Sequence, residues 1–407
     1  MLFLELRQRS APCRVLAACT RLVAKHLRKL EATQLPMLAK RGAPTTMCDL
    51  QHGEWLPIED EAGVRACPGL RDAGDRRCSN SIPLLQFRPR RCTEQQWPAL
   101  TVHNVERALG GRTLRFIGDS VTSDHYHHLT ACLMNCNASH PRRQWFMRFA
   151  DSKNKNAWVR ALVQAGYSTG DANAAIRHMG ANIGKDGYKG GCALGSGHVD
   201  YRRLNLLNNP AAPNVTRAIF HALLYLSSRP VTSSDVVVIN FSLHGSLATR
   251  GVLRRQMAIV LDWWAEQRRA GRAPMLLWRE SSPQHWAGPF GAFRSFADGD
   301  GLSEQCTAHA HAQAAFARHS YDANVSADIH EAAHDWAQVL PVFTATWPRV
   351  DDHPLARVGA LGGKGWREEA RLANHSYMDC NHFCVPGSVN RFWNQALLSW
   401  LAGHPPR

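Results

Sequence analysis

The stretch that most constrains the fold is Thr113–Ser120, which reads Thr-Leu-Arg-Phe-Ile-Gly-Asp-Ser. Its short apolar run predicts a strand that stops at Gly118, and Val121–Leu133 is predicted to be a helix. A side chain on such a turn stands above the sheet, near helix N–H groups that favour negative charge. Ser120 is therefore a candidate nucleophile, with Gly118 and Asp119 as candidates for its oxyanion site. Taken alone, the tripeptide is equally typical of a turn in which the serine is an N-cap.

A candidate base lies near the other end of the chain, in the sequence Asp379-Cys-Asn-His382. The i, i+3 spacing puts both side chains on one side of a helical turn. Asp379 can then accept from one imidazole nitrogen of His382, and the other nitrogen can take the proton of Ser120. An isolated Asp-x-x-His is usually a surface turn. The serine turn and this pair together predict a Ser-His-Asp triad.

From residue 101 onward, patterns typical of strands and helices alternate. The predicted strands are Asp235–Asn240, Pro274–Trp278 and, more weakly, Val339–Phe343, and the predicted helices are Leu253–Arg269 and Val389–Leu401. This order predicts a parallel sheet covered on both faces by helices. The stretch 151–215 has little periodicity, and we expect it to form long loops over a substrate groove.

The amino-acid composition divides the chain into three regions. Residues 1–46 form a basic leader, expected to be disordered or targeting, without the apolar run of about 18–20 residues that spans a bilayer. An amphipathic helix, a transit peptide and a damaged gene model are all compatible with it. Residues 47–100 are rich in Cys and Pro and are expected to pack as a loop-rich segment on the catalytic domain, residues 101–407.

Charge and cysteine content limit the partners and the compartment. The net charge is +15 with a pI of about 9.6, which favours acidic partners such as polyanionic glycans, nucleic acid or membrane surfaces. No compact Lys/Arg run with interleaved aromatics is present, so we expect no nucleic-acid partner. The 12 cysteines lack zinc-finger spacing, and together with glycosylation sequons at Asn137, Asn214, Asn324 and Asn374 they indicate an oxidising compartment.

Several ordered blocks carry a resemblance to a known family. They are Cys48–Pro57, Cys67-Pro68, Arg77-Cys78, Phe87–Cys92, Leu114–Ser120, Trp278–His285, Asp352-His353-Pro354, Asp379–Gly387 and Phe392-Trp393-Asn394. In this order they resemble the plant trichome-birefringence-like proteins, members of the PC-esterase group of SGNH (GDSL-like) enzymes. The resemblance covers residues 48 to about 402. It implies a three-layer α/β fold with an SGNH-hydrolase-like parallel sheet and a disulfide-stapled, loop-rich N-terminal segment.

The resemblance also implies an activity and further site residues. The activity is O-acetyl transfer to hydroxyls of a cell-wall or secreted polysaccharide through an acyl-serine, with an acetyl donor as co-substrate and no bound cofactor. Asn240, at the end of a predicted strand, corresponds to the oxyanion asparagine. Arg279 and His285 are expected beside the site, where a guanidinium binds acyl or sugar oxygens, although a buried structural Arg fits equally. The chain departs from the family after Ser120, because Ser123-Asp124-His125 stands where relatives carry Arg-Asn-Gln. The loss of a positive charge and the gain of Asp124 change the field near the nucleophile, so we expect a different substrate or acceptor from that of the plant enzymes.

The family's cysteine order implies four bridges: Cys48–Cys92, Cys67–Cys132, Cys78–Cys384 and Cys306–Cys380. Spacing alone does not give this pairing, since eight cysteines allow 105 connectivities. The resemblance further implies the secretory pathway, with the Golgi lumen as the expected location. We expect a monomer. Relatives carry an N-terminal membrane anchor that is not evident here, so membrane association is expected through the N-terminal or a missing segment.

Three alternatives remain open from the sequence. The same triad with water as acceptor is a carbohydrate acetylesterase. A protein of the same fold that binds polysaccharide without catalysis is a second alternative, although the Ser, Asp and His argue against it. The third is a zinc metallopeptidase through His330-Glu-Ala-Ala-His334, with Glu368 or Glu369 as third ligand. No metzincin continuation follows this sequence, so we expect a solvated helix face and no metal.

Overall fold

The computed structural model describes most of the 407-residue chain from Cys48 onward. The described residues are 48–65, 67, 82–136, 152–182, 191–204, 212–226, 229–240, 247–285, 306–307, 320–333, 336–356 and 377–406. The predicted basic leader, residues 1–46, lies outside them. Within the described residues, no helix is both long and apolar enough to cross a membrane.

The centre of the fold is a six-stranded sheet in the order β4-β5-β3-β6-β7-β8. Its strands are β3 (Thr113–Gly118), β4 (Gly191–Leu194), β5 (Gly197–Arg203), β6 (Val236–Asn240), β7 (Met275–Arg279) and β8 (Ala337–Leu340). All neighbours pair in parallel except β4, which pairs antiparallel with β5 at one edge. The carboxyl ends of β3, β6 and β7 therefore meet at one edge, where Asp119, Asn240 and Arg279 lie.

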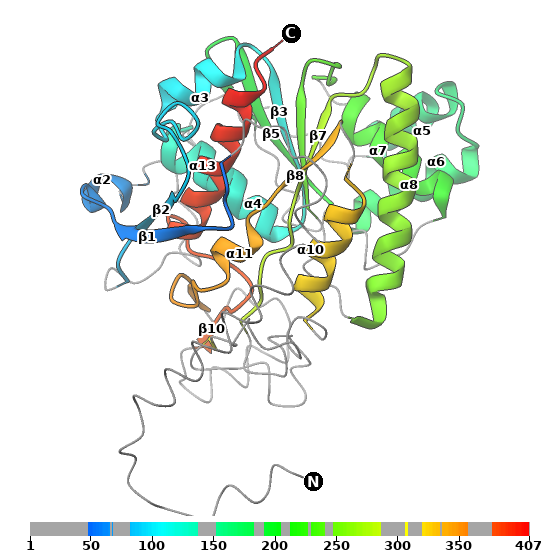
Figure 1. The fold of residues 1–407 in the computed structure, drawn as a ribbon. Coiled ribbons are helices and arrows are strands. Elements are labelled where there is room, and N and C mark those ends of the chain that lie inside the picture. Colours follow the sequence, from blue (N-terminus) through cyan, green and yellow to red (C-terminus); the bar gives the residue numbers. More distant parts are fainter. Residues whose placement is uncertain are drawn as a thin grey trace, which may run out of the picture.

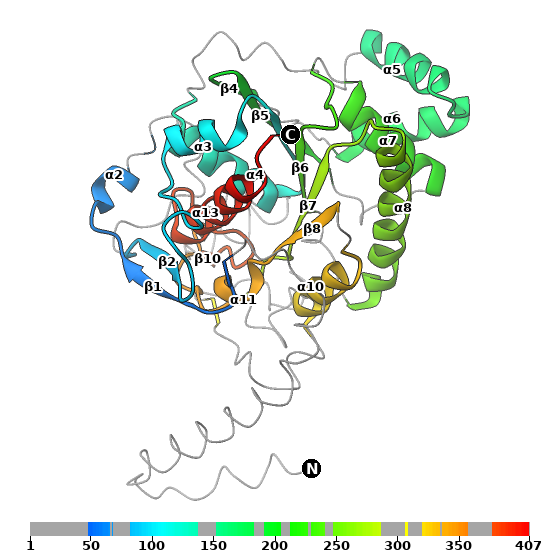
Figure 2. The ribbon, with the colours of Figure 1, turned by 45° about the horizontal axis from the view of Figure 1, so that its top comes forward.

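Helices cover both faces of this sheet (Figures 1 and 2). On one face lie α3 (Val102–Leu109), α4 (Ser120–His127) and α13 (Ser388–Gly403). On the other lie α5 (Ser152–Gln164), α6 (Thr169–Asn182), α7 (Pro213–Tyr225), α8 (Arg250–Arg269) and α10 (Tyr321–Glu331). This confirms the predicted three-layer α/β fold.

The central strand β6 shows why the sequence forms this sheet. Its side chains alternate: Val236 and Val238 join the core under α13, while Val237 and Ile239 join the core under α7 and α8. Successive strand residues point to opposite faces, so a strand covered on both faces must be apolar throughout. The same burial explains why the run is continuous rather than alternating with polar residues.

One charged pair lies inside the sheet. The Arg115 guanidinium, fully buried on β3, donates to both carboxylate oxygens of Asp200 on β5, at 2.7 and 2.8 Å. It also donates to the main-chain carbonyls of Leu223, Leu224 and Arg229. Burial opposes ionisation of Asp200, but the neighbouring arginines outweigh it and lower its pKa to about 2. The pair therefore keeps its charge because its polar atoms find partners.

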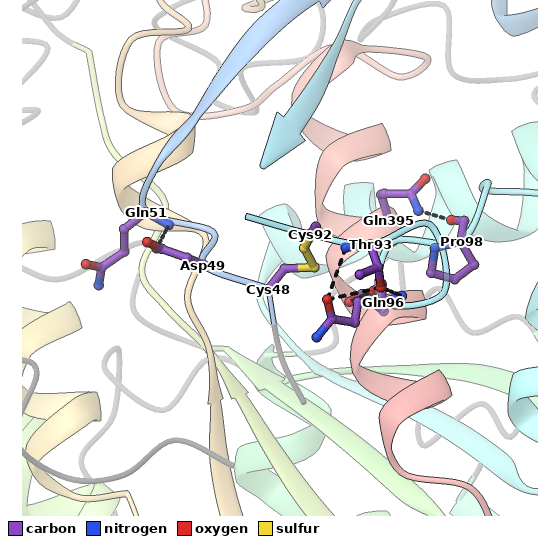
Figure 3. Close-up of a disulfide and its surroundings, with 9 residues drawn as sticks. Cys48, Asp49, Gln51, Cys92, Thr93, Gln96, Pro98 and Gln395 are labelled. Carbon is purple, nitrogen blue, oxygen red and sulfur yellow. Dashed lines mark hydrogen bonds between the residues drawn. A yellow bond between two sulfur atoms is a disulfide. The ribbon is translucent and has the colours of Figure 1, made fainter. Parts of the chain in front are cut away.

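The N-terminal segment packs on the C-terminal helix. It contains the hairpin of β1 (Gly53–Pro57) and β2 (Leu85–Pro89) and the short helix α2 (Glu61–Arg65). Trp55 and Phe87 pack edge-to-face on Phe392 of α13, with ring centroids 5.6 and 4.8 Å away. The Cys48–Cys92 bridge closes the segment, and Gln395 of α13 donates to the Pro98 carbonyl beside it (Figure 3).

Three of the four expected disulfides are present in the described residues: Cys48–Cys92, Cys67–Cys132 and Cys306–Cys380. Cys384 is also disulfide-bonded, but its expected partner Cys78 lies outside the described residues. A further bridge, Cys136–Cys192, was not predicted. It links Cys136, which follows the π-helical turn η3 (His128–Leu133) after α4, to Cys192 in the edge strand β4.

Two local predictions were wrong. The stretch 151–215 does not form long loops over a groove: it contains α5, α6, β4 and β5, and α7 begins within it. Buried residues of α5 and α6, such as Trp158, Leu162 and Met179, pack on the α7 side of the sheet. The predicted strand Val339–Phe343 also ends earlier, at Leu340, because Pro341 has no N–H for the ladder, and the short helix α11 (Phe343–Thr346) follows.

Three further short elements complete the described chain. The 3-10 turn η5 (Leu247–Thr249) leads into α8. The strands β9 (Leu355–Ala356) and β10 (Tyr377–Met378) pair antiparallel, and β10 leads directly into the Asp379–His382 turn.

Candidate active site

The nucleophile turn connects β3 to α4 and requires a glycine. A Cβ on Gly118 would overlap the main-chain carbonyl of Asn240, because β6 approaches closely at this point. Asp119 is the N-cap of α4, and its carboxylate accepts from the N–H groups of Val121 and Thr122 at 3.0 and 3.3 Å. Ser120 is thus the first residue of α4, where the helix N-terminus favours developing negative charge.

A residue that the sequence analysis missed holds this turn from the neighbouring strand. The Tyr201 hydroxyl, fully buried on β5, lies 3.1 Å from the carbonyl oxygen of Gly118 and 2.8 Å from that of Asp119. No local motif marks Tyr201, and only its pairing position on β5, opposite Phe116, brings it there.

The three predicted triad residues lie together. The Ser120 hydroxyl is 2.7 Å from Nε2 of His382, and Nδ1 of His382 is 2.7 Å from Oδ2 of Asp379. The other carboxylate oxygen of Asp379 accepts from the main-chain N–H groups of Asn381 and His382. With the proton on Nδ1 donated to Asp379, Nε2 is left to accept the serine proton, which is the geometry of an activated nucleophile.

The turn that carries Asp379 and His382 is fixed on several sides. We call residues 379–384 the base loop. Its main chain bonds to the segment 352–354: Asp379 N–H donates to the Pro354 carbonyl at 3.0 Å, and Cys384 N–H donates to the Asp352 carbonyl at 2.9 Å. The Cys306–Cys380 bridge adds a covalent link. The base is therefore placed by contacts from distant parts of the chain.

The Asp352 carboxylate connects this support to α13. It accepts from the N–H groups of Ser388 and Val389, at 3.2 and 2.7 Å, and so caps the first turn of the helix. Burial raises the pKa of Asp352 to about 7, opposed by Arg349 and these N–H donors. The base loop, Asp352 and α13 consequently form one connected unit behind the nucleophile.

Asn240 lies at the end of β6, as predicted, but its side chain is engaged elsewhere. Its amide nitrogen donates to the main-chain carbonyls of Arg279 at 3.0 Å and Glu280 at 2.9 Å, and the residue is buried. Because both amide hydrogens are used, the predicted oxyanion donor is not available in this arrangement. The amide instead ties the end of β6 to the end of β7.

Arg279 is fully buried, which corrects the expectation that its guanidinium binds substrate oxygens. Nη1 donates to the Ser282 hydroxyl at 2.9 Å, and the guanidinium carbon lies 4.2 Å from the ring centre of Trp393. Burial lowers the pKa of Arg279 to about 10, and the Asp119 carboxylate counteracts this. Arg279 is a buried cation behind the Asp119 turn, the structural alternative that its sequence also allowed.

His285 is likewise buried and does not face a substrate. Its Nδ1 lies 2.7 Å from Nε2 of His353, and its Nε2 lies 2.9 Å from the Trp347 carbonyl oxygen. Like Asn240 and Arg279, His285 was predicted to contact substrate but makes its contacts within the protein. His353 belongs to a block that the sequence analysis noted without assigning it a role.

Two sequence features remain, the His330-Glu-Ala-Ala-His334 sequence and Asp124. Nε2 of His330 is 2.6 Å from Oε1 of Glu280, while His334 and both candidate third ligands, Glu368 and Glu369, lie outside the described residues. Within the described residues, no group of three potential ligands could hold a metal ion. Asp124, the departure from the family, is buried.

Comparison with known proteins finds a family model that matches part of the chain. Residues 202–400 match the model of the PC-Esterase family, described as a GDSL/SGNH-like acyl-esterase family found in Pmr5 and Cas1p. In this range the chain is similar to the PC-esterase family. The base loop lies inside the matched range, and the nucleophile turn precedes it.

A curated relative extends the likeness over nearly the whole chain. The chain is 22% identical over 394 residues to Xyloglucan O-acetyltransferase 4 of Populus trichocarpa, covering 90% of this chain and 83% of that protein. The PC-esterase resemblance predicted from the motifs is confirmed.

Proposed function

We propose that this protein is a serine-dependent O-acyltransferase that moves an acetyl group to a hydroxyl of a polysaccharide. The observation that carries the proposal is the continuous pair of 2.7 Å contacts from Ser120 through His382 to Asp379. The relative from Populus trichocarpa, named as a xyloglucan O-acetyltransferase, supports a polysaccharide acceptor and an acetyl group.

The reaction proceeds in two transfers of the acyl group. Ser120 Oγ attacks the acyl carbonyl carbon while its proton moves to Nε2 of His382, and His382 then returns a proton to the departing donor. The acyl-serine is attacked by a sugar hydroxyl, whose proton passes to Nε2 and then to Ser120 Oγ. Asp379 accepts from Nδ1 throughout and stabilises the imidazolium.

The developing oxyanion is stabilised by the N-terminus of α4. The N–H of Ser120 belongs to the first residue of this helix, where the backbone dipoles present partial positive charge. The Asn240 amide contributes indirectly, by fixing the carbonyls at the end of β7. No bound cofactor is needed for this chemistry, and the acetyl donor is a second substrate.

Hydrolysis is the second candidate, because the family description names acyl-esterases. With water in place of the sugar hydroxyl, the same residues release the acid instead of a sugar ester. We further propose that the protein is made in the secretory pathway, since its described disulfides require an oxidising compartment.

The test is incubation with an acetyl donor and a panel of oligosaccharides, followed by mass spectrometry. Acetylated sugar supports transfer, and free acetate without acetylated sugar supports hydrolysis. The absence of both products would contradict an enzymatic role. Ser120→Ala should abolish both products with the fold intact, because it removes one hydroxyl from a side chain that is 8% exposed. Near wild-type turnover in folded Ser120→Ala would refute the role of this serine.

A further inference from the structure

Two buried histidines behind the base loop form a chain of three hydrogen bonds. Nε2 of His285 faces the carbonyl oxygen of Trp347 at 2.9 Å, and Nδ1 of His285 faces Nε2 of His353 at 2.7 Å. Nδ1 of His353 then contacts the carbonyl oxygen of His382. Both rings are fully buried, so all four ring nitrogens have a fixed neighbour inside the protein.

Counting protons along this chain shows that two neutral rings do not satisfy it. The carbonyl oxygens at both ends only accept, so each end requires an N–H, one on His285 and one on His353. The two remaining nitrogens then face each other with lone pairs, and a bond between them needs a third proton. Any neutral arrangement leaves one pair of acceptors in contact, whereas three protons satisfy all three contacts.

We propose that His285 and His353 share one extra proton and that this charged pair positions the catalytic base by holding the main-chain carbonyl of His382. The proposal rests on the proposed function of His382. Both histidines are positioning residues, since their ring nitrogens contact each other and the carbonyls of Trp347 and His382. The backbone bond from His285 N–H to the Cys380 carbonyl, at 3.0 Å, fixes the same loop from the same side.

The aromatic rings around the pair favour a delocalised cation. Phe383 stacks on His353 with ring centroids 4.4 Å apart and 27° between the planes. Trp347 lies 5.4 Å from His285, and Phe383 meets His285 edge-on at 6.2 Å. Aromatic faces attract a cation, most strongly where water is excluded.

The charged groups that face the pair come from two segments. From the base loop, the Asp379 carboxylate raises the pKa of His353, whereas the His382 imidazole lowers it. From the segment before Pro354, Arg349 is bound to Asp351 at 2.8 Å, and the Asp352 carboxylate is turned toward α13. Burial is the largest influence and lowers the pKa of His353 to about 4, whereas only the third proton completes all three bonds of the chain at once, which favours the charge.

The sign of the pH dependence follows from this balance. At low pH the third proton is bound, all three bonds exist, and the His382 carbonyl is held. As pH rises the proton leaves, one bond is lost, and the base loop loosens. Because the held carbonyl belongs to the residue that accepts the serine proton, kcat should fall with rising pH as the pair is deprotonated.

Nitrogen-15 NMR of histidine-labelled Ser120→Ala protein tests the proton count without any turnover. Spectra of the added variants His285→Gln and His353→Asn assign the two rings by difference. We expect three N–H protons on the two rings at the low end of the range and two at the high end. Two neutral rings throughout the range from pH 5 to 8 would overturn the proposal, whatever the activity of the enzyme.

The pH profile of kcat tests the consequence for catalysis. His285→Gln keeps a donor for the Trp347 carbonyl, and His353→Asn keeps one for the His382 carbonyl, but neither can hold the shared proton. Each should lower kcat about 10- to 100-fold at the wild-type optimum and abolish the falling limb. His52→Gln, at an exposed histidine of the N-terminal segment, should keep the wild-type profile. An unchanged falling limb in both buried variants would contradict the shared-proton pair.

Discussion

Replacing Asp379 by Asn changes the proton positions in the triad with little change in its shape. The Asn oxygen can keep accepting from the N–H groups of Asn381 and His382, at 3.2 and 3.3 Å, which leaves the amide nitrogen facing Nδ1 of His382. Because that nitrogen is a donor, Nδ1 must become the acceptor and Nε2 must carry the proton. Nε2 then cannot take the proton of Ser120 at 2.7 Å.

The expected loss is about 10⁴-fold in kcat, the size seen when the orienting carboxylate of a serine triad becomes an amide. At about 1.4 kcal/mol per factor of ten, this raises the barrier by about 5 kcal/mol. The assay is acetyl transfer or release at saturating donor, with thermal unfolding to check the fold. Folded Asp379→Asn protein with kcat within tenfold of wild type would refute the assigned role.

The chain supplies a matched control for this substitution. Asp49 and His52 have the same i, i+3 spacing, with Oδ2 of Asp49 2.7 Å from Nδ1 of His52 and Oδ1 accepting from the Gln51 N–H. Their side chains are 40% and 52% exposed, against 18% and 14% for the triad pair. Asp49→Asn should leave kcat unchanged, so a loss there would mean that the assay reports folding and not catalysis.

Two stability predictions concern the sheet. Arg115→Ala should lower the free energy of unfolding by about 3–5 kcal/mol, because it removes the bidentate partner of the buried Asp200 carboxylate and leaves only the longer contact from Arg202, at 3.4 Å. Arg254→Ala on the surface should change it by less than about 1 kcal/mol. Chemical denaturation measures both, and equal effects would contradict the argument. Gly118→Ala should abolish folding or activity, since the added Cβ would overlap the Asn240 carbonyl. The control Gly251→Ala in α8 should be tolerated, because its Cβ meets only the far end of the Arg255 side chain. Soluble yield and activity measure both.

The sequence was sufficient for the features that depend on local chemistry. A strand that ends at Gly118 before a helix, and an Asp three residues before His382, each specify a short-range geometry that little else in the chain can alter. Their meeting in space depends on the parallel sheet, which the order of strands and helices predicted. Asp49 and His52 show the limit of this reasoning, because the same spacing there lies on an exposed turn.

The partners of buried polar side chains could not be predicted in the same way. Asn240 was placed correctly at the end of its strand, but whether its amide faces a ligand or the carbonyls of Arg279 and Glu280 depends on the path of the next loop. Tyr201 was missed for the same reason: its hydroxyl acts on residues of another strand. Helices α5 and α6 were missed because small and polar residues weaken the apolar periodicity of their buried faces.

Arg279 offers the clearest test of how the sequence blocks near the site should be understood. If the block Trp278–His285 contacts substrate, Arg279→Met should raise KM. In the structure the guanidinium is fully buried against Trp393 and Ser282, so no substrate atom reaches it. We therefore expect Arg279→Met to lower kcat or stability, through the Asp119 turn that it faces, and to leave KM within about twofold. Initial-rate kinetics with varied oligosaccharide separate a substrate contact from a structural role. A KM raised tenfold or more at unchanged kcat would show that Arg279 contacts the substrate.

The same reasoning applies to His285, whose ring nitrogens are both directed to the protein. The blocks after β7 thus support the base loop, and the residues that select the sugar must lie elsewhere along the carboxyl edge of the sheet.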